Sequence, residues 1–197
     1  MTTIRSSTDR TPAAERGATL VEFAVLAPLL ILLLFGIVEM GLALRDQLTV
    51  ANSVSGAARI GSVVGNQPEA DIAVLDAVEA GLVGGLDADV ITKVIIYKAN
   101  ADGSSSGLED QYTYDPSDPT CPWNPCPDPL HPSFGGYGSP SSYPPSGRID
   151  TLPDPDIIGV RVEYQHNWAT TVLPFMQTPA AWDADARMRL EPDVSGT

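Results

Sequence analysis

Two cysteines are the residues most able to do chemistry in the second half of the chain. Cys121 and Cys126 enclose the residues Pro-Trp-Asn-Pro, and His131 follows soon after. Outside the cytoplasm this spacing favours a local disulfide. A structural zinc ion usually takes four Cys or His ligands, and His166 is the only other histidine. We therefore expect a Cys121–Cys126 disulfide and no metal, with a metal site or free thiols as the alternatives.

A second candidate motif is the run GSSSG at 103–107, which matches the G-x-S-x-G pattern of serine hydrolases. That pattern requires a sharp turn between a strand and a helix, whereas this run has the composition of a loop. His166 has no identifiable partner in the sequence and is expected on the surface of a strand. The sequence contains no phosphate-binding loop, HExxH or EF-hand motif. We predict no catalytic residue, no cofactor and no enzymatic activity.

One carboxylate, Glu22, lies near the start of a long apolar run. Residues 18–44 read ATLVEFAVLAPLLILLLFGIVEMGLAL, with no charge from Phe23 to Val38. As a helix the run would be about 40 Å long, against about 30 Å for the bilayer core. It is predicted to be a transmembrane helix with Glu22 and Glu39 near its two ends. Since a carboxylate there costs on the order of 2–3 kcal/mol, Glu22 is either functional or reaches the headgroups.

The charges on either side of this helix predict its orientation. Arg5, Arg10 and Arg16 precede it, whereas only Arg45 follows closely, beside Asp46. The positive-inside rule then places the N-terminus in the cytoplasm and the remaining mass outside it. A cleaved secretory signal is the competing interpretation, but its apolar core is usually only about 7–15 residues long. We therefore predict a single-pass membrane protein.

Several short motifs occur along the first third of the chain. They are Arg16-Gly17-Ala18, Val21-Glu22-Phe23, Pro28, Phe35-Gly36-Ile37 followed by Glu39, Ala51-Asn52, and Gly56-Ala57-Ala58-Arg59-Ile60-Gly61. The first two resemble the processing site of type IV pilin-like proteins, in which a glycine precedes the cleaved bond and Glu is the fifth residue after it. With all these motifs, residues 16–64 are similar to TadE-like proteins, the pseudopilins of the tight-adherence (Flp) pilus assembly system.

This resemblance implies cleavage between Gly17 and Ala18 by a prepilin peptidase, and helix assembly through Glu22, Phe23 and Glu39. The new amine of one subunit would meet Glu22 of a neighbour, where opposite charges neutralise each other at low dielectric.

The resemblance also implies a minor, non-enzymatic component of a bacterial pilus assembly or secretion apparatus. Its partners would be the lipid bilayer and other pilin-like or pilus assembly membrane proteins. The alternative is a membrane-anchored extracytoplasmic binding module unrelated to pili, with residues 99–156 as its contact surface. Entry into the fibre and retention at its base are both open.

Beyond the membrane, the chain is predicted to form a small α+β domain. The long pilin-like helix should continue to residue 64, stop at Gly65-Asn66-Gln67-Pro68, and precede a short helix at 68–83. Alternating or β-branched residues predict strands of a small antiparallel sheet at 90–97, 157–168 and 184–190. A long Pro/Gly/Ser-rich loop at 99–156 separates the first two strands.

Composition divides the chain into successive segments and limits its partners. The net charge is −14 and no basic run is present, which argues against binding to nucleic-acid phosphates. The acidic surface is expected to favour solubility. The predicted segments are a cytoplasmic leader at 1–17, the transmembrane helix at 18–44, a helical extension with the second helix and first strand at 45–98, the Pro/Gly/Ser-rich insertion at 99–156, further strands at 157–192 and a tail at 193–197.

Overall fold

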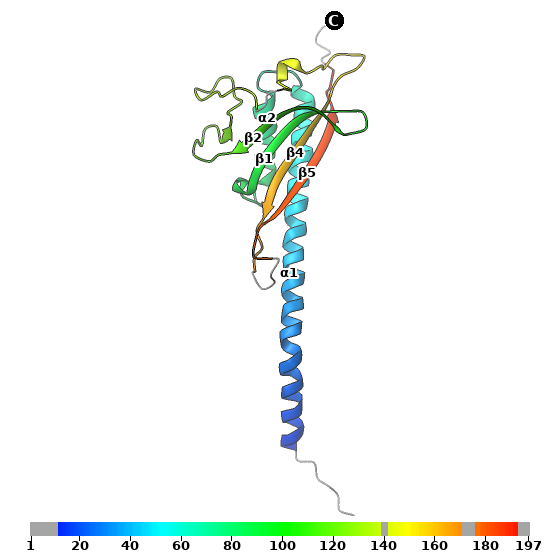
Figure 1. The fold of residues 1–197 in the computed structure, drawn as a ribbon, viewed down its shortest axis with the longest axis vertical. Helices are drawn as coiled ribbons and strands as arrows, with labels where there is room; N and C mark the ends of the chain where they lie inside the picture. The colour runs from blue at the N-terminus through cyan, green and yellow to red at the C-terminus, as the bar shows by residue number, and fades with distance from the viewer. Residues whose placement is uncertain (1–11, 139–141, 171–175, 193–197) are drawn as a thin grey trace, which may run out of the picture.

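A single long helix carries a small head of helix and sheet at one end (Figure 1). The computed structural model describes residues 12–138, 142–170 and 176–192. Helix α1 (Pro12–Val64) has 53 residues and is therefore about 80 Å long. It ends where the sequence predicted, because Gly65 adopts a left-handed φ of 49° and its N–H bonds the Gly61 carbonyl at 3.1 Å.

Helix α2 (Ala70–Leu82) confirms the predicted second helix and lies antiparallel beside the second half of α1. Their backbones come close at Gly81, where an added Cβ would lie 2.7 Å from the Cα of Ser53. The Ser53 hydroxyl donates a 2.6 Å hydrogen bond to the Val78 carbonyl across the same contact. The two helices can therefore pack this closely because position 81 has no side chain.

Five antiparallel strands form one sheet in the order β3-β2-β1-β4-β5. Its strands are β1 (Ile91–Ala99), β2 (Ser105–Tyr114), β3 (Trp123–Asn124), β4 (Ile157–His166) and β5 (Ala180–Arg189). The predicted α+β class and antiparallel sheet are confirmed. Two short 3-10 turns, Ala88–Val90 and Pro145–Gly147, precede β1 and β4.

The main core lies between one face of the sheet and the two helices. Alternate residues of β4 point into it, as the sequence pattern predicted, while the residues between them face the other side. Helices α1 and α2 and the sheet all contribute buried aliphatic and aromatic side chains to this core. They include Val50, Val54, Leu75, Val78, Val94, Ile96, Tyr112, Trp123, Ile158, Val160, Val162 and Tyr164.

The long insertion is more ordered than the sequence indicated. Strand β2 and the short β3 both lie within residues 99–156, a stretch that was expected to be a long loop. The sequence of β2, SSGLEDQYTY, is too polar to show a strand pattern. It pairs with β1 in register from Val94 opposite Tyr112, so the open edge of β1 decides its conformation. The predicted third strand likewise starts earlier, at Ala180.

A buried polar cluster fixes the end of this insertion to the head. Arg148 and Asp71 form an ion pair in which both side chains are completely buried, and Tyr112 donates a 2.5 Å hydrogen bond to Asp71. Asp110 accepts the Ser142 N–H at 3.0 Å. Burial, followed by the nearby charge of Asp71, raises the pKa of Asp110 to about 6.

Candidate functional site: the N-terminal helix

The first half of α1 exposes apolar side chains around its circumference. The most apolar stretch has a mean hydropathy of 2.7, and none of it is buried within the chain. Each large side chain there forgoes about 1.5–3 kcal/mol that burial would provide. A helix that is apolar all round is typical of a membrane span, and α1 is long and apolar enough to cross a membrane. The exposed residues include Leu20, Val21, Phe23, Val25, Leu29, Leu30, Leu33, Leu34, Ile37 and Val38.

The length of this exposed stretch matches a bilayer. Glu39 is the first buried side chain of α1 after Thr19. From Thr19 to Val38 the helix rises about 30 Å, which is the thickness of the hydrocarbon core. The head therefore begins to cover α1 where a span of minimum length would end, and the last residues of the predicted 18–44 segment lie against the head.

The predicted processing and assembly residues lie at the far end of α1 from the head. Gly17 and Ala18 are part of the helix, and Gly17 is exposed. Glu22 is exposed as well, and Phe23 is 64% exposed. These positions leave Glu22 and Phe23 accessible to lipid or to another helix, and their role in assembly stays a prediction.

Glu39 differs from Glu22 although both were predicted to act in helix assembly. Its side chain is 1% exposed. It accepts the N–H of Ala169 at 3.1 Å and also the N–H of Thr170, both from the connection between β4 and β5. Because its oxygens already bind the chain's own backbone, the structure gives Glu39 an intrachain role that the sequence did not indicate.

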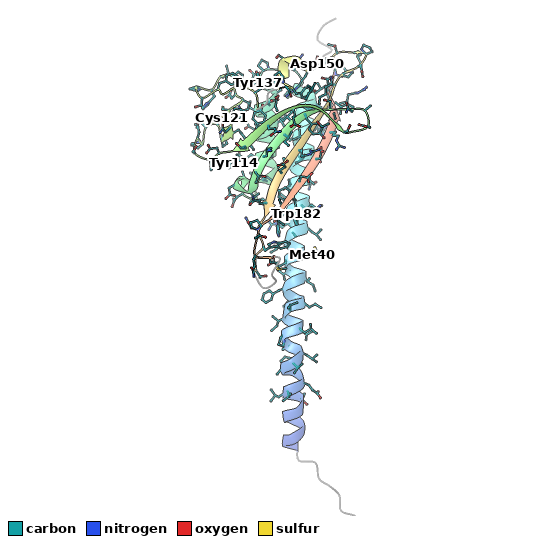
Figure 2. All side chains as sticks on the ribbon, viewed as in Figure 1. Met40, Tyr114, Cys121, Tyr137, Asp150 and Trp182 are labelled. Carbon is teal, nitrogen blue, oxygen red and sulfur yellow. A yellow bond between two sulfur atoms is a disulfide. The ribbon has the colours of Figure 1, made fainter. Side chains whose placement is uncertain are left out.

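A contact between a histidine and an aspartate lies farther along α1, on the side of the head. His166 Nδ1 is 2.7 Å from a carboxylate oxygen of Asp46 on α1, and its ring stacks on Trp182 with centroids 5.0 Å apart. Trp168 meets the same ring edge-on at 4.7 Å. The expectation of a strand-surface histidine was wrong, because His166 is 2% exposed and continues the inward alternation of β4. In Figure 2, the labels of Met40 and Trp182 show where this end of the sheet meets α1.

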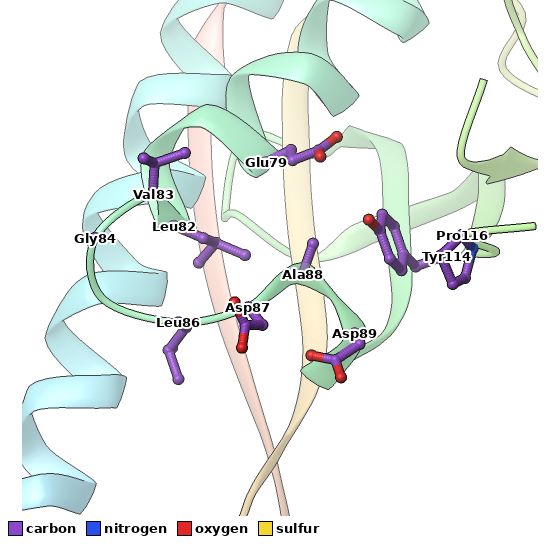
Figure 3. A pocket seen from close by; sticks show the side chains of 10 residues that line it. All are labelled: Glu79, Leu82, Val83, Gly84, Leu86, Asp87, Ala88, Asp89, Tyr114 and Pro116. Atoms are coloured by element: carbon purple, nitrogen blue, oxygen red, sulfur yellow. The ribbon is translucent and has the colours of Figure 1, made fainter. Parts of the chain in front are cut away.

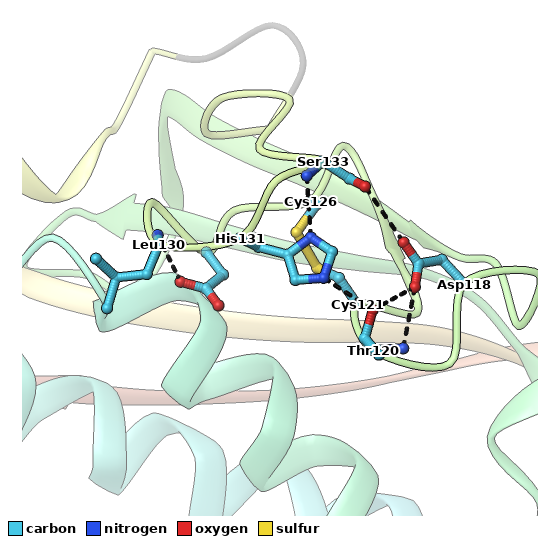
Figure 4. The surroundings of a disulfide bond; sticks show 8 residues. Asp118, Thr120, Cys121, Cys126, Leu130, His131 and Ser133 are labelled. Carbon is cyan, nitrogen blue, oxygen red and sulfur yellow. Dashed lines mark hydrogen bonds between the residues drawn. A yellow bond between two sulfur atoms is a disulfide. The ribbon is translucent and has the colours of Figure 1, made fainter.

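The cysteine pair forms a disulfide in the insertion (Figure 4). The potential ligand atoms of Cys121, Cys126 and His131 lie within 4.8 Å of one another, but bonded sulfurs are not the thiolates that bind zinc. His131 contacts Thr120 through Nε2 at 2.8 Å and accepts the Ser133 N–H at Nδ1. Both ring nitrogens therefore hold the local loop together.

Hydrogen bonds from Thr120 stabilise a carboxylate beside this disulfide. The Thr120 hydroxyl and N–H both bind Asp118 and lower the pKa of that carboxyl. The same hydroxyl contacts His131, so Asp118, Thr120 and His131 form one chain of polar contacts around the subloop. Their arrangement is that of a loop-stabilising network.

The GSSSG run at 103–107 does not form a nucleophile elbow. It forms the end of the β1–β2 turn and the first residues of β2, whereas an elbow leads from a strand into a helix. The Ser105 hydroxyl accepts the Gly107 N–H at 3.1 Å.

A shallow cleft lies at the C-terminal end of α2 (Figure 3). It combines apolar residues such as Leu82 and Val83 with the carboxylates of Glu79, Asp87 and Asp89. The residues that line it include no histidine, cysteine or serine.

Comparison with known proteins addresses the N-terminal helix alone. No curated protein and no solved structure matches the chain. One family model matches, and it covers residues 17–59. The matched range holds the exposed apolar stretch of α1, with Glu22 and Glu39, and the first part of the helix that packs in the head. The resemblance noted in the sequence is therefore confirmed: over residues 17–59 this chain is similar to the family described as TadE-like protein.

Proposed function

We propose that this chain is a minor pilin-like membrane component of a tight-adherence pilus assembly or secretion apparatus. Helix α1 anchors it in the bacterial cell membrane, with the N-terminus in the cytoplasm and the head outside. The similarity of residues 17–59 to TadE-like proteins supports the link to pili. The exposed apolar helix supports the anchor.

The observation that carries this proposal is an exposed carboxylate inside the apolar stretch. Glu22 lies one residue before the charge-free run that starts at Phe23, and it is exposed on α1. An ionised carboxylate at such a place costs on the order of 2–3 kcal/mol unless a partner neutralises it. After cleavage by a prepilin peptidase, the amine of Ala18 in a neighbouring subunit would supply that partner.

The face of α1 on the membrane side of the head suits contact with another helix. Added Cβ atoms on Gly36 and Gly41 would meet nothing within 4 Å, so small residues leave the helix backbone open there. Small residues let membrane helices approach closely. This face is a shallow groove lined by Leu29, Leu32, Leu33, Gly36, Ile37, Met40, Gly41 and Leu44.

The proposed role is non-enzymatic. In the described parts of the chain, the Ser105 hydroxyl accepts the Gly107 N–H and His166 contacts Asp46 on α1, and the two residues lie at opposite ends of the sheet. Replacement of either residue should leave pilus assembly or secretion unchanged as long as the head folds.

Substitution of Glu22 tests the proposal. Glu22→Leu and Glu22→Gln should reduce the number of surface pili, or the amount of secreted cargo, while the chain still inserts in the membrane. Glu69→Gln is the matched control, because Glu69 is exposed at the start of α2 and makes no capping hydrogen bond with its side chain. Normal pili in the Glu22 variants would refute the proposal.

The N-terminus of the mature chain gives an independent test. N-terminal sequencing of the protein extracted from membranes should start at Ala18 if a prepilin peptidase acts at Gly17. A start beyond residue 44 would mean that the apolar segment had been removed, and would refute the anchor.

A further inference from the structure

The end of the sheet that lies nearest the apolar half of α1 has an unusual composition. From Tyr164 to Trp182 the chain contains no Asp, Glu, Lys or Arg, although these residues make up 18% of the sequence. The run includes the last residues of strand β4, the β4–β5 connection and the first residues of strand β5. In a chain with a net charge of −14, the β4–β5 run is therefore uncharged, and it reaches toward the predicted membrane (Figure 1).

Two contacts with α1 define the height of this end above the membrane. The N–H groups of Ala169 and Thr170 bind Glu39, so they lie at the level of residue 39. His166 contacts Asp46, which is about 10 Å farther along the helix. If Thr19–Val38 fills the hydrocarbon core, the first level falls in the headgroup layer, which is about 5–8 Å thick on each side.

The side chains at this end suit the same layer. Trp168 and Trp182 are both partly exposed, with ring centroids 6.4 Å apart. The indole N–H of Trp168 already donates to the Thr178 carbonyl at 3.1 Å. Tryptophan is enriched where membrane meets water, because its large ring is apolar and its N–H is polar.

The absence of carboxylates from the β4–β5 run also removes an electrostatic penalty. The cytoplasmic membrane contains anionic lipids, and a negatively charged protein surface close to their phosphates would be repelled. Two carboxylates of α1 contact this run, and both are occupied. The head buries Glu39, whose oxygens bind backbone N–H groups, and Asp46 lies 2.7 Å from His166 Nδ1 with its side chain 16% exposed. A charge-free surface at this height can touch the headgroups without that cost.

We propose that the membrane-facing tip of the head, residues 168–170 and 176–179, rests in the headgroup layer of the bilayer that α1 crosses. Its partner is the phospholipid surface. Trp168 is its main tryptophan contact, and Trp182, which stacks on His166, lies at the outer boundary of the layer. This inference rests on the proposed function only in requiring that α1 spans the membrane. Contact at this end, together with the span, would set the tilt of the head over the membrane.

Fluorescence quenching by brominated lipids tests the contact on the full chain. The protein is reconstituted in phosphatidylcholine vesicles whose acyl chains carry bromine either near the headgroup or near the bilayer centre. A Trp123→Phe variant retains only Trp168 and Trp182. Its emission should lose more intensity with the shallow bromines than with the deep ones. The unsubstituted chain should show the same order of quenching, so the test does not depend on the variant folding.

Two control variants separate this inference from the membrane span. A Trp168→Phe/Trp182→Phe variant keeps Trp123, which is 2% exposed in the core, and its emission should not respond to either lipid. Adding Leu30→Trp to that variant places a reporter at mid-span, which the deep bromines should quench. Quenching of this reporter without quenching of Trp168 and Trp182 would overturn the contact and leave the span intact. An unquenched reporter would overturn the span itself.

Discussion

The close approach of α1 and α2 at Gly81 can be tested by adding one methyl group. In Gly81→Ala the new Cβ would lie 2.7 Å from the Cα, Cβ and Oγ atoms of Ser53. Carbon atoms in favourable contact are about 3.5–4.0 Å apart. One of the colliding atoms belongs to the backbone of α1, so rotation of a side chain cannot relieve the collision. We expect α2 to move away from α1 by roughly 1 Å.

Two opposing effects determine the size of the change in stability. Alanine favours a helix by about 0.8–1 kcal/mol over glycine. Overpacking costs about 1–3 kcal/mol, and disturbing the buried Ser53–Val78 hydrogen bond, which is 2.6 Å long, costs about 0.5–1.5 kcal/mol more. Gly81→Ala should therefore lower the free energy of unfolding of the head by about 1–3 kcal/mol.

Thermal unfolding of the full chain in detergent micelles measures this effect. Trp123, Trp168 and Trp182 all lie in the head, so tryptophan fluorescence reports unfolding of the head rather than of the anchor. A destabilisation of 1 kcal/mol should lower Tm by about 2–4 °C for a chain of this size. The matched control is Gly56→Ala.

The control has the opposite expected sign. An added Cβ on Gly56 would meet nothing within 4 Å, and Gly56 is exposed on the same helix α1. Gly56→Ala should therefore stabilise the head by up to about 1 kcal/mol through helix propensity alone. If both variants raise Tm equally, the close contact at Gly81 does not exist and the reasoning fails.

Two further predictions concern buried carboxylates. The pKa of Asp110, raised to about 6, exceeds its unfolded value of about 3.9. The folded state then binds more protons between these values, so this contribution to stability is complete at low pH and is lost as pH rises through about 6. Between pH 4 and pH 8 the free energy of unfolding of Asp110→Asn should therefore fall by about 1–3 kcal/mol less than that of the native chain. The same dependence of this free energy on pH in both proteins would contradict the prediction. Glu39→Gln should speed hydrogen exchange at the Ala169 and Thr170 amides, which bind Glu39, because the charge-assisted bonds are lost. The matched Glu22→Gln variant should leave those amides unchanged, and equal exchange in both variants would show that Glu39 does not hold the connection.

Features with a local physical cause could be predicted from the sequence. The apolar run at 18–44 has no way to be stable in water as an exposed helix, so its composition alone predicts a membrane span. Gly65 and Pro68 stop the helix through their own backbone preferences. The alternation in β4 predicts which residues enter the core, because successive side chains point to opposite faces.

Features that depend on distant residues required the tertiary structure. Strand β2 has a polar sequence and exists because β1 offers it an open edge. Its hydrogen bonds come from pairing rather than from local preference, so no local pattern announces it.

Glu22 and Glu39 show the same limit within the functional helix. The sequence presents both as single carboxylates in an apolar segment and cannot tell them apart. The fold brings Ala169 and Thr170 to Glu39 across 130 residues of intervening chain, and it leaves Glu22 exposed. The sequence by itself determined that the helix is apolar enough for a membrane and carries acids near its ends. Only the tertiary structure decided which acid the head binds, because that depends on where a distant loop packs.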